Sequence, residues 1–398
     1  AKRHDDVAEA IMDEMGAPWG LARNAQAASG PQHIKAALRA LKTFEFDEQH
    51  GTTCIVKEPI GVCGLITPWN WPMNQIAVKV APALAAGCTM VLKPSEIAPF
   101  DAMIFAEIVD AAGVPAGVFN LVNGDGPGVG TALSQHPDID MMSFTGSTRA
   151  GTAVARASAA TVKRVAQELG GKSPNIILDD ANMEQAITVS VLTMMNNTGQ
   201  SCNAPSRMLV PASRLEEIKE IAIRVAESIV TGNPRDEATT MGPVVSELQW
   251  NKIQGLINKG IEEGCEVITG GPGKPEGLET GYYVKPTIFA GVTNDKTIAV
   301  EEIFGPVVTI MPFTTEDEVL QMANKVKYGL SATLWTNDLK RTMRMTNELQ
   351  AGMVWVNTWL MRDLRTPFGG IKDSGVGREG GFEALRFFTE AKNVCIKY

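Results

Sequence analysis

Residues 60–93, IGVCGLITPWNWPMNQIAVKVAPALAAGCTMVLK, are the stretch of sequence that decides the fold. Its two ends, Ile60–Ile66 and Thr89–Leu92, are apolar runs without a polar face, as is typical of strands buried on both sides. Between them, Ala77–Ala86 has the composition of a helix and is followed by Gly87, a residue that often ends helices. A buried strand, a helix and a second buried strand in this order predict a βαβ unit of a parallel sheet.

The same alternation continues along most of the chain. The next elements predicted for the first sheet are the strands Val118–Val122 and Ile139–Phe144 and the helices Ala102–Ala112 and Gly128–Ser134. After Gly170 a second α/β series runs to about Trp355, with the predicted elements Asn175–Leu178, Met183–Asn196, Met208–Val210 and a long helix from Leu215. The predicted fold class is therefore α/β, with two domains that each contain a parallel sheet.

Two segments differ from this pattern. Residues 41–59 alternate charged and apolar side chains and predict a β-hairpin that turns near His50–Gly51. The C-terminal residues 387–398, FFTEAKNVCIKY, predict a short strand with no core of its own. We expect both segments to pair with another subunit, in a homodimer or a homotetramer.

The composition excludes several classes of protein. The 398 residues carry a net charge of −9, which disfavours binding to nucleic acid or to an anionic membrane. No apolar run is long enough to span a bilayer, and nothing resembles a signal peptide, so we expect a cytoplasmic protein. The six cysteines and four histidines are scattered without CxxC or HxxxH spacing, so neither a disulfide scaffold nor a metal site is predicted.

Three segments carry residues suited to chemistry. Cys202 lies among small and polar residues, in QSCN, where a thiol is accessible as a nucleophile. Glu168 ends a strand and precedes two glycines, which we expect to leave space for a substrate or a cofactor. Asn70, in PWNWP, follows a buried parallel strand, at the edge where α/β sheets bind ligands. Together these segments supply a nucleophile, a base and a neutral hydrogen-bond donor, as acyl transfer requires.

Seven motifs give the sequence a resemblance to the aldehyde dehydrogenase superfamily, essentially from residue 50 to the end. In the order of that family they are PWNWP (68–72), LKPSE (92–96), FTGS (144–147), ELGGKSP (168–174), GQSCNAPSR (199–207), EEIFGPV (301–307) and PFGG…GREGG (367–381). The resemblance implies a Rossmann-like NAD(P)-binding domain (1–40 and 59–169), a catalytic domain (170–373) and an oligomerisation arm (41–58 and 387–398). Members of the family carry a further stretch ahead of the first helix, so we expect the N-terminal part of the cofactor domain to be missing from this sequence.

The resemblance also implies a catalytic cycle that begins at Cys202. This thiol would attack an aldehyde, while the side chain of Asn70 and the backbone N–H of Cys202 stabilise the oxyanion. Hydride transfer would leave a thioester, and Glu168 would activate the water that hydrolyses it to a carboxylic acid. Lys79 and Glu379 match a proton relay of the family, with a structural salt bridge as the alternative interpretation.

The cofactor implied by the resemblance is NAD⁺, with NADP⁺ as the alternative. Lys93 and Glu96 match the residues around the adenosine ribose, where a carboxylate repels a 2′-phosphate. Gly146 and Ser147 open the helix that follows FTGS, a position suited to a pyrophosphate. Glu302 and Phe304 match the nicotinamide side. The remaining residues expected near the cofactor are Ile66, Thr67, Trp69, Ser95, Gly126, Phe144 and Leu169.

The loop 357–368 is expected to form part of the substrate pocket. The residues expected to line this pocket are Trp71, Met73, Val78, Ser201, Arg362 and Phe368. Arg362 and Arg365 would receive a substrate carboxylate, and this loop resembles the hydroxymuconic and aminomuconic semialdehyde dehydrogenases. The alternative is a surface network of Arg362 or Arg365 with Asp363. A second arginine of those enzymes matches Leu21 here, which weakens that resemblance. The portion before about residue 310 is more similar to broad-specificity bacterial aldehyde dehydrogenases, so a broad-specificity or betaine-type enzyme is the other interpretation.

Three rival functions remain as alternatives. A CoA-acylating aldehyde dehydrogenase has no need of a glutamate such as Glu168. A cysteine hydrolase would need a histidine, and none lies near any motif. A catalytically silent protein with this fold would have no reason to keep Cys202, Glu168 and Asn70 together.

Overall fold

The computed structural model describes residues 2–397, and its first sheet contains the βαβ unit predicted from residues 60–93. Strand β3 (Val62–Ile66), helix α4 (Pro72–Ala85) and strand β4 (Thr89–Lys93) follow one another, and Val62 lies opposite Thr89 in a parallel pair. The sheet has the order β17-β7-β6-β3-β4-β5. Its other strands are β5 (Phe119–Leu121), β6 (Met141–Thr145), β7 (Arg164–Glu168) and β17 (Gly375–Val376). The helices of this lobe are α1 (His4–Met15), α2 (Trp19–Leu21), α3 (Ala28–Leu41), α5 (Phe100–Ala111), α6 (Thr131–Gln135), α7 (Thr148–Ser158) and α14 (Gly381–Phe387).

The second sheet has seven strands in the order β10-β11-β12-β9-β8-β14-β15. Their bounds are β8 (Pro174–Ile177), β9 (Arg207–Pro211), β10 (Glu266–Thr269), β11 (Thr287–Ala290), β12 (Val307–Phe313), β14 (Ser331–Trp335) and β15 (Met353–Val356). The accompanying helices are α8 (Met183–Met195), α9 (Leu215–Glu227), α10 (Glu247–Glu262), α11 (Thr297–Val300), α12 (Glu316–Asn324) and α13 (Leu339–Glu348). Separate apolar clusters pack on the two faces of this sheet, which explains why its strands have no polar side.

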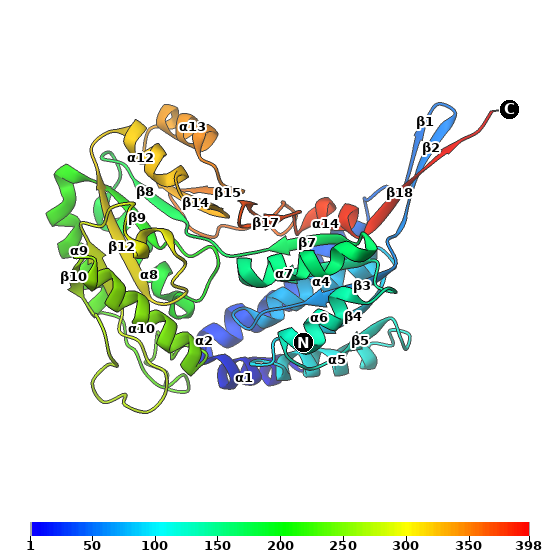
Figure 1. Ribbon diagram of the computed structural model, residues 1–398, viewed down its shortest axis with the longest axis horizontal. Coiled ribbons are helices and arrows are strands. Elements are labelled where there is room, and N and C mark those ends of the chain that lie inside the picture. The colour runs from blue at the N-terminus through cyan, green and yellow to red at the C-terminus, as the bar shows by residue number, and fades with distance from the viewer. Residues whose placement is uncertain (1, 398) are drawn as a thin grey trace.

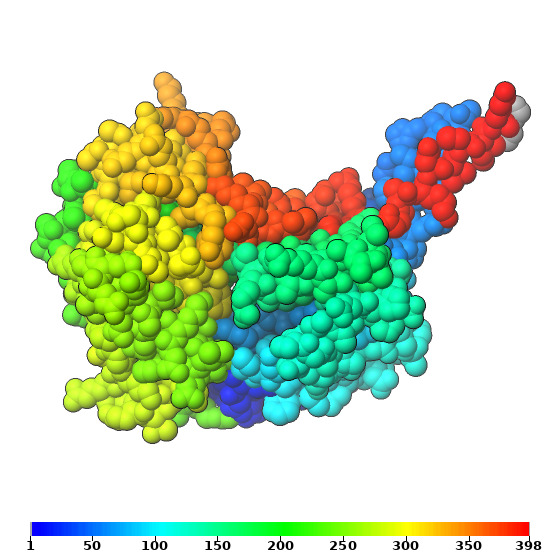
Figure 2. Space-filling view, viewed as in Figure 1, coloured from blue at the N-terminus to red at the C-terminus, as the bar shows by residue number. Residues whose placement is uncertain are grey.

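A third, three-stranded sheet projects from the lobe of the first sheet (Figures 1 and 2). It contains β1 (Asp47–His50), β2 (Thr53–Pro59) and β18 (Thr389–Cys395), with β2 in the middle. The predicted hairpin, its turn and the C-terminal strand are therefore confirmed, and we call this sheet the arm. Within residues 2–397, no helix is long and apolar enough to cross a membrane.

Two details of the predicted fold are wrong. The sheets are not purely parallel, because β17 joins β7 and β10 joins β11 in antiparallel pairs at the sheet edges. The helix predicted from Gly128 begins as a π-helical turn at Gly126–Gly130 before α6. The side chain of Asp125 accepts a hydrogen bond from the backbone N–H of Gly128, and this cap starts the turn earlier than the apolar pattern indicates.

Candidate active site

Cys202 is carried by a loop with an unusual backbone. Asn197 and Thr198 have φ values of 53° and 54°, a left-handed conformation that is costly for residues other than glycine. Hydrogen bonds offset this cost, since the side-chain amide of Asn197 donates to the carbonyl of Asn70 at 2.9 Å and its oxygen accepts from Gln26 at 2.8 Å. The nucleophile loop and the PWNWP segment are thus fastened to each other.

The two glycines after Glu168 make room for the chain itself. A Cβ on Gly171 would lie 2.3 Å from the carbonyl oxygen of Cys202, and one on Gly170 would lie 2.5 Å from the Glu302 carboxylate. The backbone N–H of Gly171 also donates to Glu302 at 2.9 Å. The glycines therefore admit Cys202 and Glu302, and Gly170 also lines the cavity beside Cys202, where space for a substrate or cofactor was predicted.

These segments enclose a cavity of about 250 Å³. Nine predicted residues line it: Trp69, Asn70, Gly146, Ser147, Glu168, Leu169, Cys202, Glu302 and Phe304. The rings of Trp69 and Phe304 meet edge to face, with centroids 5.4 Å apart. Residues as distant in the sequence as Trp69 and Phe304 therefore line the same cavity, as expected at the carboxyl ends of parallel strands.

Burial controls the acid–base properties of Cys202 and Glu168. It raises the pKa of the Cys202 thiol to about 12, and the nearby carboxylates of Glu302 and Glu168 act in the same direction. Burial also raises the pKa of Glu168 well above its usual range, with a further contribution from the charge of Glu379. The thiol is therefore protonated at rest, and Glu168 is a stronger base than an exposed glutamate.

Lys79 and Glu379 form a buried ion pair with a separation of 2.5 Å. The ammonium group of Lys79 also donates to the hydroxyl of Ser143 at 3.1 Å. The charges of both residues act on Glu168, so the pair lies close to the carboxylate expected to serve as the base. This arrangement suits either interpretation of the pair, a proton relay or a salt bridge.

Asn70 is buried, and one of its side-chain hydrogens is already used. Its amide nitrogen donates to the carbonyl of Gln200 at 3.0 Å. A primary amide has two N–H donors, so the second remains for a ligand. The hydrogen bond to Gln200 fixes the direction of that second donor.

A second cavity, of about 410 Å³, lies farther along the first sheet. Four predicted cofactor residues line it: Ile66, Glu96, Gly126 and Phe144. Lys93 is buried beneath and donates to Glu96 at 3.1 Å, close to the buried residues Thr67 and Ser95. Ser147 caps α7 by accepting from the backbone N–H of Ala150, so the start of this helix lies between the two cavities.

The substrate-side residues fall into two groups. Trp71 donates from its indole to the hydroxyl of Ser201 at 2.9 Å, and Met73 and Val78 are buried on α4. The guanidinium of Arg362 stacks on the ring of Phe368 at 4.1 Å, and its Nε is buried without a hydrogen-bond partner among the described residues.

The other arginine of this loop was placed wrongly. Arg365 is exposed and pairs with Asp363 through several hydrogen bonds, so the prediction that it faces the pocket is wrong. The surface network foreseen as the alternative holds for Arg365 alone. Leu21 packs against the core of the first lobe.

Several residues at the site have no sequence signal. Gln249 and Lys252 of α10 line the first cavity, and Gln249 donates to the carbonyl of Phe304 at 2.7 Å. Ser374 donates to the carbonyl of Gly170 at 2.7 Å and accepts from the N–H of Gly329 at 3.0 Å. These contacts join segments that are far apart in the sequence, so no local sequence pattern predicts them. Arg149, at the rim of the second cavity, was recognisable because it lies two residues after Ser147.

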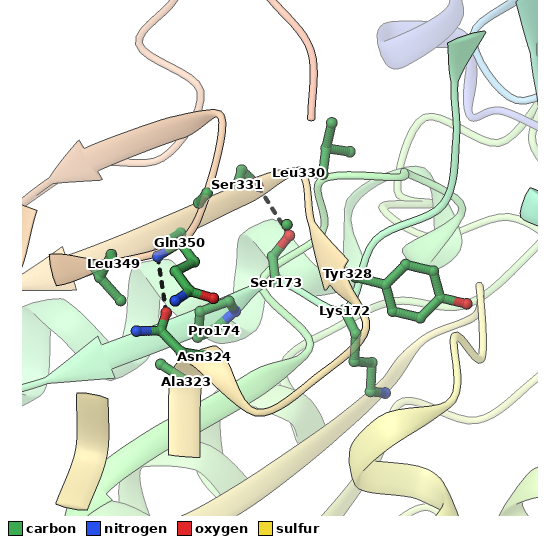
Figure 3. Close-up of a pocket in the computed structure, with 13 residues that line it drawn as sticks. Lys172, Ser173, Pro174, Ala323, Asn324, Tyr328, Leu330, Ser331, Leu349 and Gln350 are labelled. Carbon is green, nitrogen blue, oxygen red and sulfur yellow. Dashed lines mark hydrogen bonds between the residues drawn. The ribbon is translucent and has the colours of Figure 1, made fainter. Parts of the chain in front are cut away.

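Lys172, in ELGGKSP, lies next to the site but outside its cavity. Figure 3 shows Ser173 joined to Ser331 by a hydrogen bond of 2.9 Å, while the side chain of Lys172 extends away from them. The ammonium group of Lys172 is buried without a partner among the described residues, and burial lowers its pKa to about 7. The charge of Lys172 opposes the rise that burial causes in the pKa of Glu302.

The geometry of the site agrees with comparisons to known proteins. The model of the aldehyde dehydrogenase family matches residues 1–394. The chain belongs to the aldehyde dehydrogenase family. This aldehyde dehydrogenase is 56% identical over 391 residues to the 3-succinoylsemialdehyde-pyridine dehydrogenase of a Pseudomonas species, a match that covers 98% of this chain and 82% of that protein.

Solved aldehyde dehydrogenases have the same fold. The chain superposes with a TM-score of 0.98 on a cysteine-to-alanine mutant of aldehyde dehydrogenase C from Pseudomonas syringae, crystallised with NAD⁺ and octanal. That protein is 48% identical, and the match covers 99% of this chain and 81% of the other. An aldehyde dehydrogenase from Bartonella henselae gives a TM-score of 0.97 at 48% identity, with 99% and 83% covered.

Proposed function

We propose that this enzyme oxidises an aldehyde to a carboxylic acid with NAD⁺, through a thioester on Cys202 that water hydrolyses. The observation that carries the proposal is the single cavity lined by Cys202, Glu168 and Asn70. A nucleophile, a base and a hydrogen-bond donor facing one space are the groups that acyl transfer needs. Glu168 distinguishes hydrolysis from transfer to another thiol, because only the former needs a base for water.

Each residue has a defined part in the proposed cycle. The Cys202 thiol gives its proton to solvent water, and the thiolate adds to the aldehyde carbon. The free N–H of Asn70 and the backbone N–H of Cys202 donate to the resulting oxyanion. After oxidation, Glu168 takes a proton from the water that attacks the thioester, and Cys202 leaves as the thiolate. Lys79 and Glu379 then relay the proton away from the buried Glu168.

The two cavities fit a dinucleotide. Glu302 and Phe304 would hold the nicotinamide end, and Glu96 with Lys93 would hold the adenosine ribose. The start of α7, capped by Ser147, offers free backbone N–H groups to a pyrophosphate between them. The bound cofactor would supply the hydride acceptor. The NAD⁺ in the solved relative supports this assignment.

Arg362 supports a more specific proposal about the substrate. We infer that the aldehyde carries an oxygen acceptor at its far end, a carboxylate as in acidic semialdehydes, because the Nε of Arg362 is buried and unpartnered. The relative named for a semialdehyde of succinoylpyridine supports an oxygen-bearing substrate. The relative crystallised with octanal favours a second candidate, broad specificity for simple aldehydes.

The experiment that tests these proposals is NADH formation over a panel of aldehydes, with NAD⁺ in excess. Arg362→Ala is expected to lower kcat/KM about tenfold or more for succinic semialdehyde relative to octanal. Arg365→Ala is the matched control, since this arginine is exposed and paired with Asp363. Equal losses for both aldehydes would remove the carboxylate-binding role of Arg362, and no NADH from any aldehyde would refute the activity.

We also propose that the arm joins subunits into a homodimer or homotetramer. It is a three-stranded sheet whose outer strands, β1 and β18, keep one edge each unpaired among the described residues. Unpaired edges are surfaces on which another chain adds a strand. Light scattering of a chain that ends before residue 387 tests this proposal, and an unchanged mass would contradict it.

A further inference from the structure

The side chain of Asn197 holds Asn70 from outside the cavity. The Nδ2 of Asn197 donates to the backbone carbonyl of Asn70 at 2.9 Å and to the carbonyl of Gln200 at 3.2 Å. The carbonyl of Gln200 is also the acceptor for the side-chain amide of Asn70, at 3.0 Å. One amide group therefore contacts both the backbone of Asn70 and the carbonyl that fixes its side chain.

These contacts decide which way the amide of Asn197 faces. On one side it meets two carbonyl oxygens, which can only accept, so its NH₂ group must face them and its Oδ1 must face the other way. On that other side Oδ1 accepts from the Nε2 of Gln26 at 2.8 Å. Gln26 is thus the donor that this orientation of Asn197 requires.

Gln26 comes from a distant part of the sequence. It is fully buried in a π-helical turn, Ala22–Ala27, between α2 and α3. Its own orientation is unfavourable, because its Oε1 is buried without a hydrogen-bond partner among the described residues. Turning the amide over would place this oxygen against Oδ1 of Asn197, which is also an acceptor. The unpartnered oxygen therefore accompanies an orientation that serves Asn197.

We propose that Asn197, oriented by Gln26, is a positioning residue for the oxyanion donor of Asn70. This inference rests on the proposed function. Asn197 and Gln26 lie outside the cavity of Cys202, so they act through Asn70 and the carbonyl of Gln200. Without the amide of Asn197, the backbone of Asn70 loses a hydrogen-bond donor, and the direction of its free N–H toward the developing oxyanion is no longer fixed.

The same change made in two backgrounds tests the proposal. Asn197→Gly removes the side chain, and glycine tolerates the left-handed backbone of this residue, where φ is 53°. We expect the rate of NADH formation in a single turnover to fall about tenfold or more, with KM for NAD⁺ unchanged. In the Asn70→Ala background, which already lacks the oxyanion donor, Asn197→Gly should lower this rate by less than about threefold.

Two further variants complete the design. Val162→Gly is the control, because it places glycine at another left-handed position, on an exposed residue, and should leave the rate unchanged. Gln26→Met keeps the length of the side chain but removes the donor. It should lower the rate by itself and add no further loss to Asn197→Gly, because Gln26 acts through Asn197.

The outcomes separate this inference from the proposed function. An equal loss from Asn197→Gly in both backgrounds would overturn the inference, since Asn197 would then act by a route other than Asn70. An unchanged rate in folded Asn197→Gly would overturn it as well and leave the proposed function intact. If Asn197→Gly does not fold, Gln26→Met is compared in the same two backgrounds with the same expected pattern. Wild-type enzyme that forms no NADH from any aldehyde would refute the proposed function instead.

Discussion

The carbonyl oxygen of Cys202 lies against the α-carbon of Gly171, so that even a methyl group on residue 171 would come within 2.3 Å of it. Gly171→Ala must therefore push the nucleophile loop aside. Because misplacing a reacting atom by about 1 Å costs on the order of a hundredfold in rate, we expect kcat to fall by about that factor. Steady-state NADH formation measures the loss.

Gly255→Ala is the matched control for this variant. Gly255 lies in α10, and a Cβ there would meet no atom within 4 Å. Alanine favours helices over glycine by about 1 kcal/mol, so this control should be active and slightly more stable. Full activity of Gly171→Ala would show that the loop adjusts without moving the thiol.

Glu168→Gln should separate the two halves of the reaction. Because glutamine cannot take a proton from water, the thioester should accumulate, with a burst of NADH and little turnover afterwards. Stopped-flow absorbance with enzyme at substrate-like concentration measures the burst. A steady rate equal to that of the wild type would remove Glu168 from the role of base.

The acidic limb of the wild-type pH profile should reflect Glu168 as well. Burial and Glu379 raise the pKa of this carboxyl, and the base must be ionised, so activity should fall with decreasing pH well above the range of exposed glutamates. The dependence of kcat on pH checks this expectation. A profile that stays flat down to about pH 5 would contradict it.

Glu96→Gln should weaken the preference for NAD⁺. Glu96 lines the second cavity, where its negative charge repels a 2′-phosphate. We expect kcat/KM for NADP⁺ relative to NAD⁺ to rise about tenfold, as removal of one close like-charge contact allows. Glu276→Gln removes an equal charge from an exposed site and should leave the ratio as it is. No change in Glu96→Gln would assign the preference to other residues.

Asp101 should make the protein less stable as pH rises. It is fully buried at the start of α5, both its oxygens lack a partner among the described residues, and burial and the neighbouring Glu14 raise its pKa. Burial likewise raises the pKa of Glu14 to about 7. A carboxyl that holds its proton more tightly in the folded chain loses stability as pH rises above the unfolded value of about 4.

Asp101→Asn should remove part of this loss. We expect a gain of about 1–3 kcal/mol in the free energy of unfolding at pH 8, with little effect near pH 4. Thermal unfolding across this pH range measures it. Asp110→Asn, on the exposed side of the same helix, should change neither the free energy of unfolding nor its dependence on pH. A gain that does not depend on pH would assign the effect to packing instead of ionisation.

The sequence predicts the strands well, because strands that are buried on both faces are continuous runs of apolar residues. Ile60–Ile66 and Thr89–Leu92 agree with β3 and β4 within two residues at each end. The first cavity was also predictable, since Cys202, Glu168 and Asn70 each lie in or near the end of a strand and each have the residue type that their chemistry requires.

The features that the sequence did not predict depend on how the loops fold and on contacts between distant segments. Arg362 and Arg365 have the same side chain and nearly the same place in the sequence, and only the folded loop turns one inward and the other toward Asp363. Ser374 binds the carbonyl of Gly170 across 204 positions, which no local pattern reports. Gly171 was recognised as necessary, but its reason lies in the carbonyl of Cys202.

Strand β17 has a consequence for how the enzyme is made. Gly375 pairs with Glu168, and the carbonyl of Ser374 accepts from the backbone N–H of Leu169, so the strand that carries the proposed base is completed by a segment from much later in the sequence. A ribosome makes Cys202 and Glu302 long before it reaches Gly375. Chains released before residue 375 would therefore carry the proposed nucleophile beside a proposed base that lacks its supporting strand.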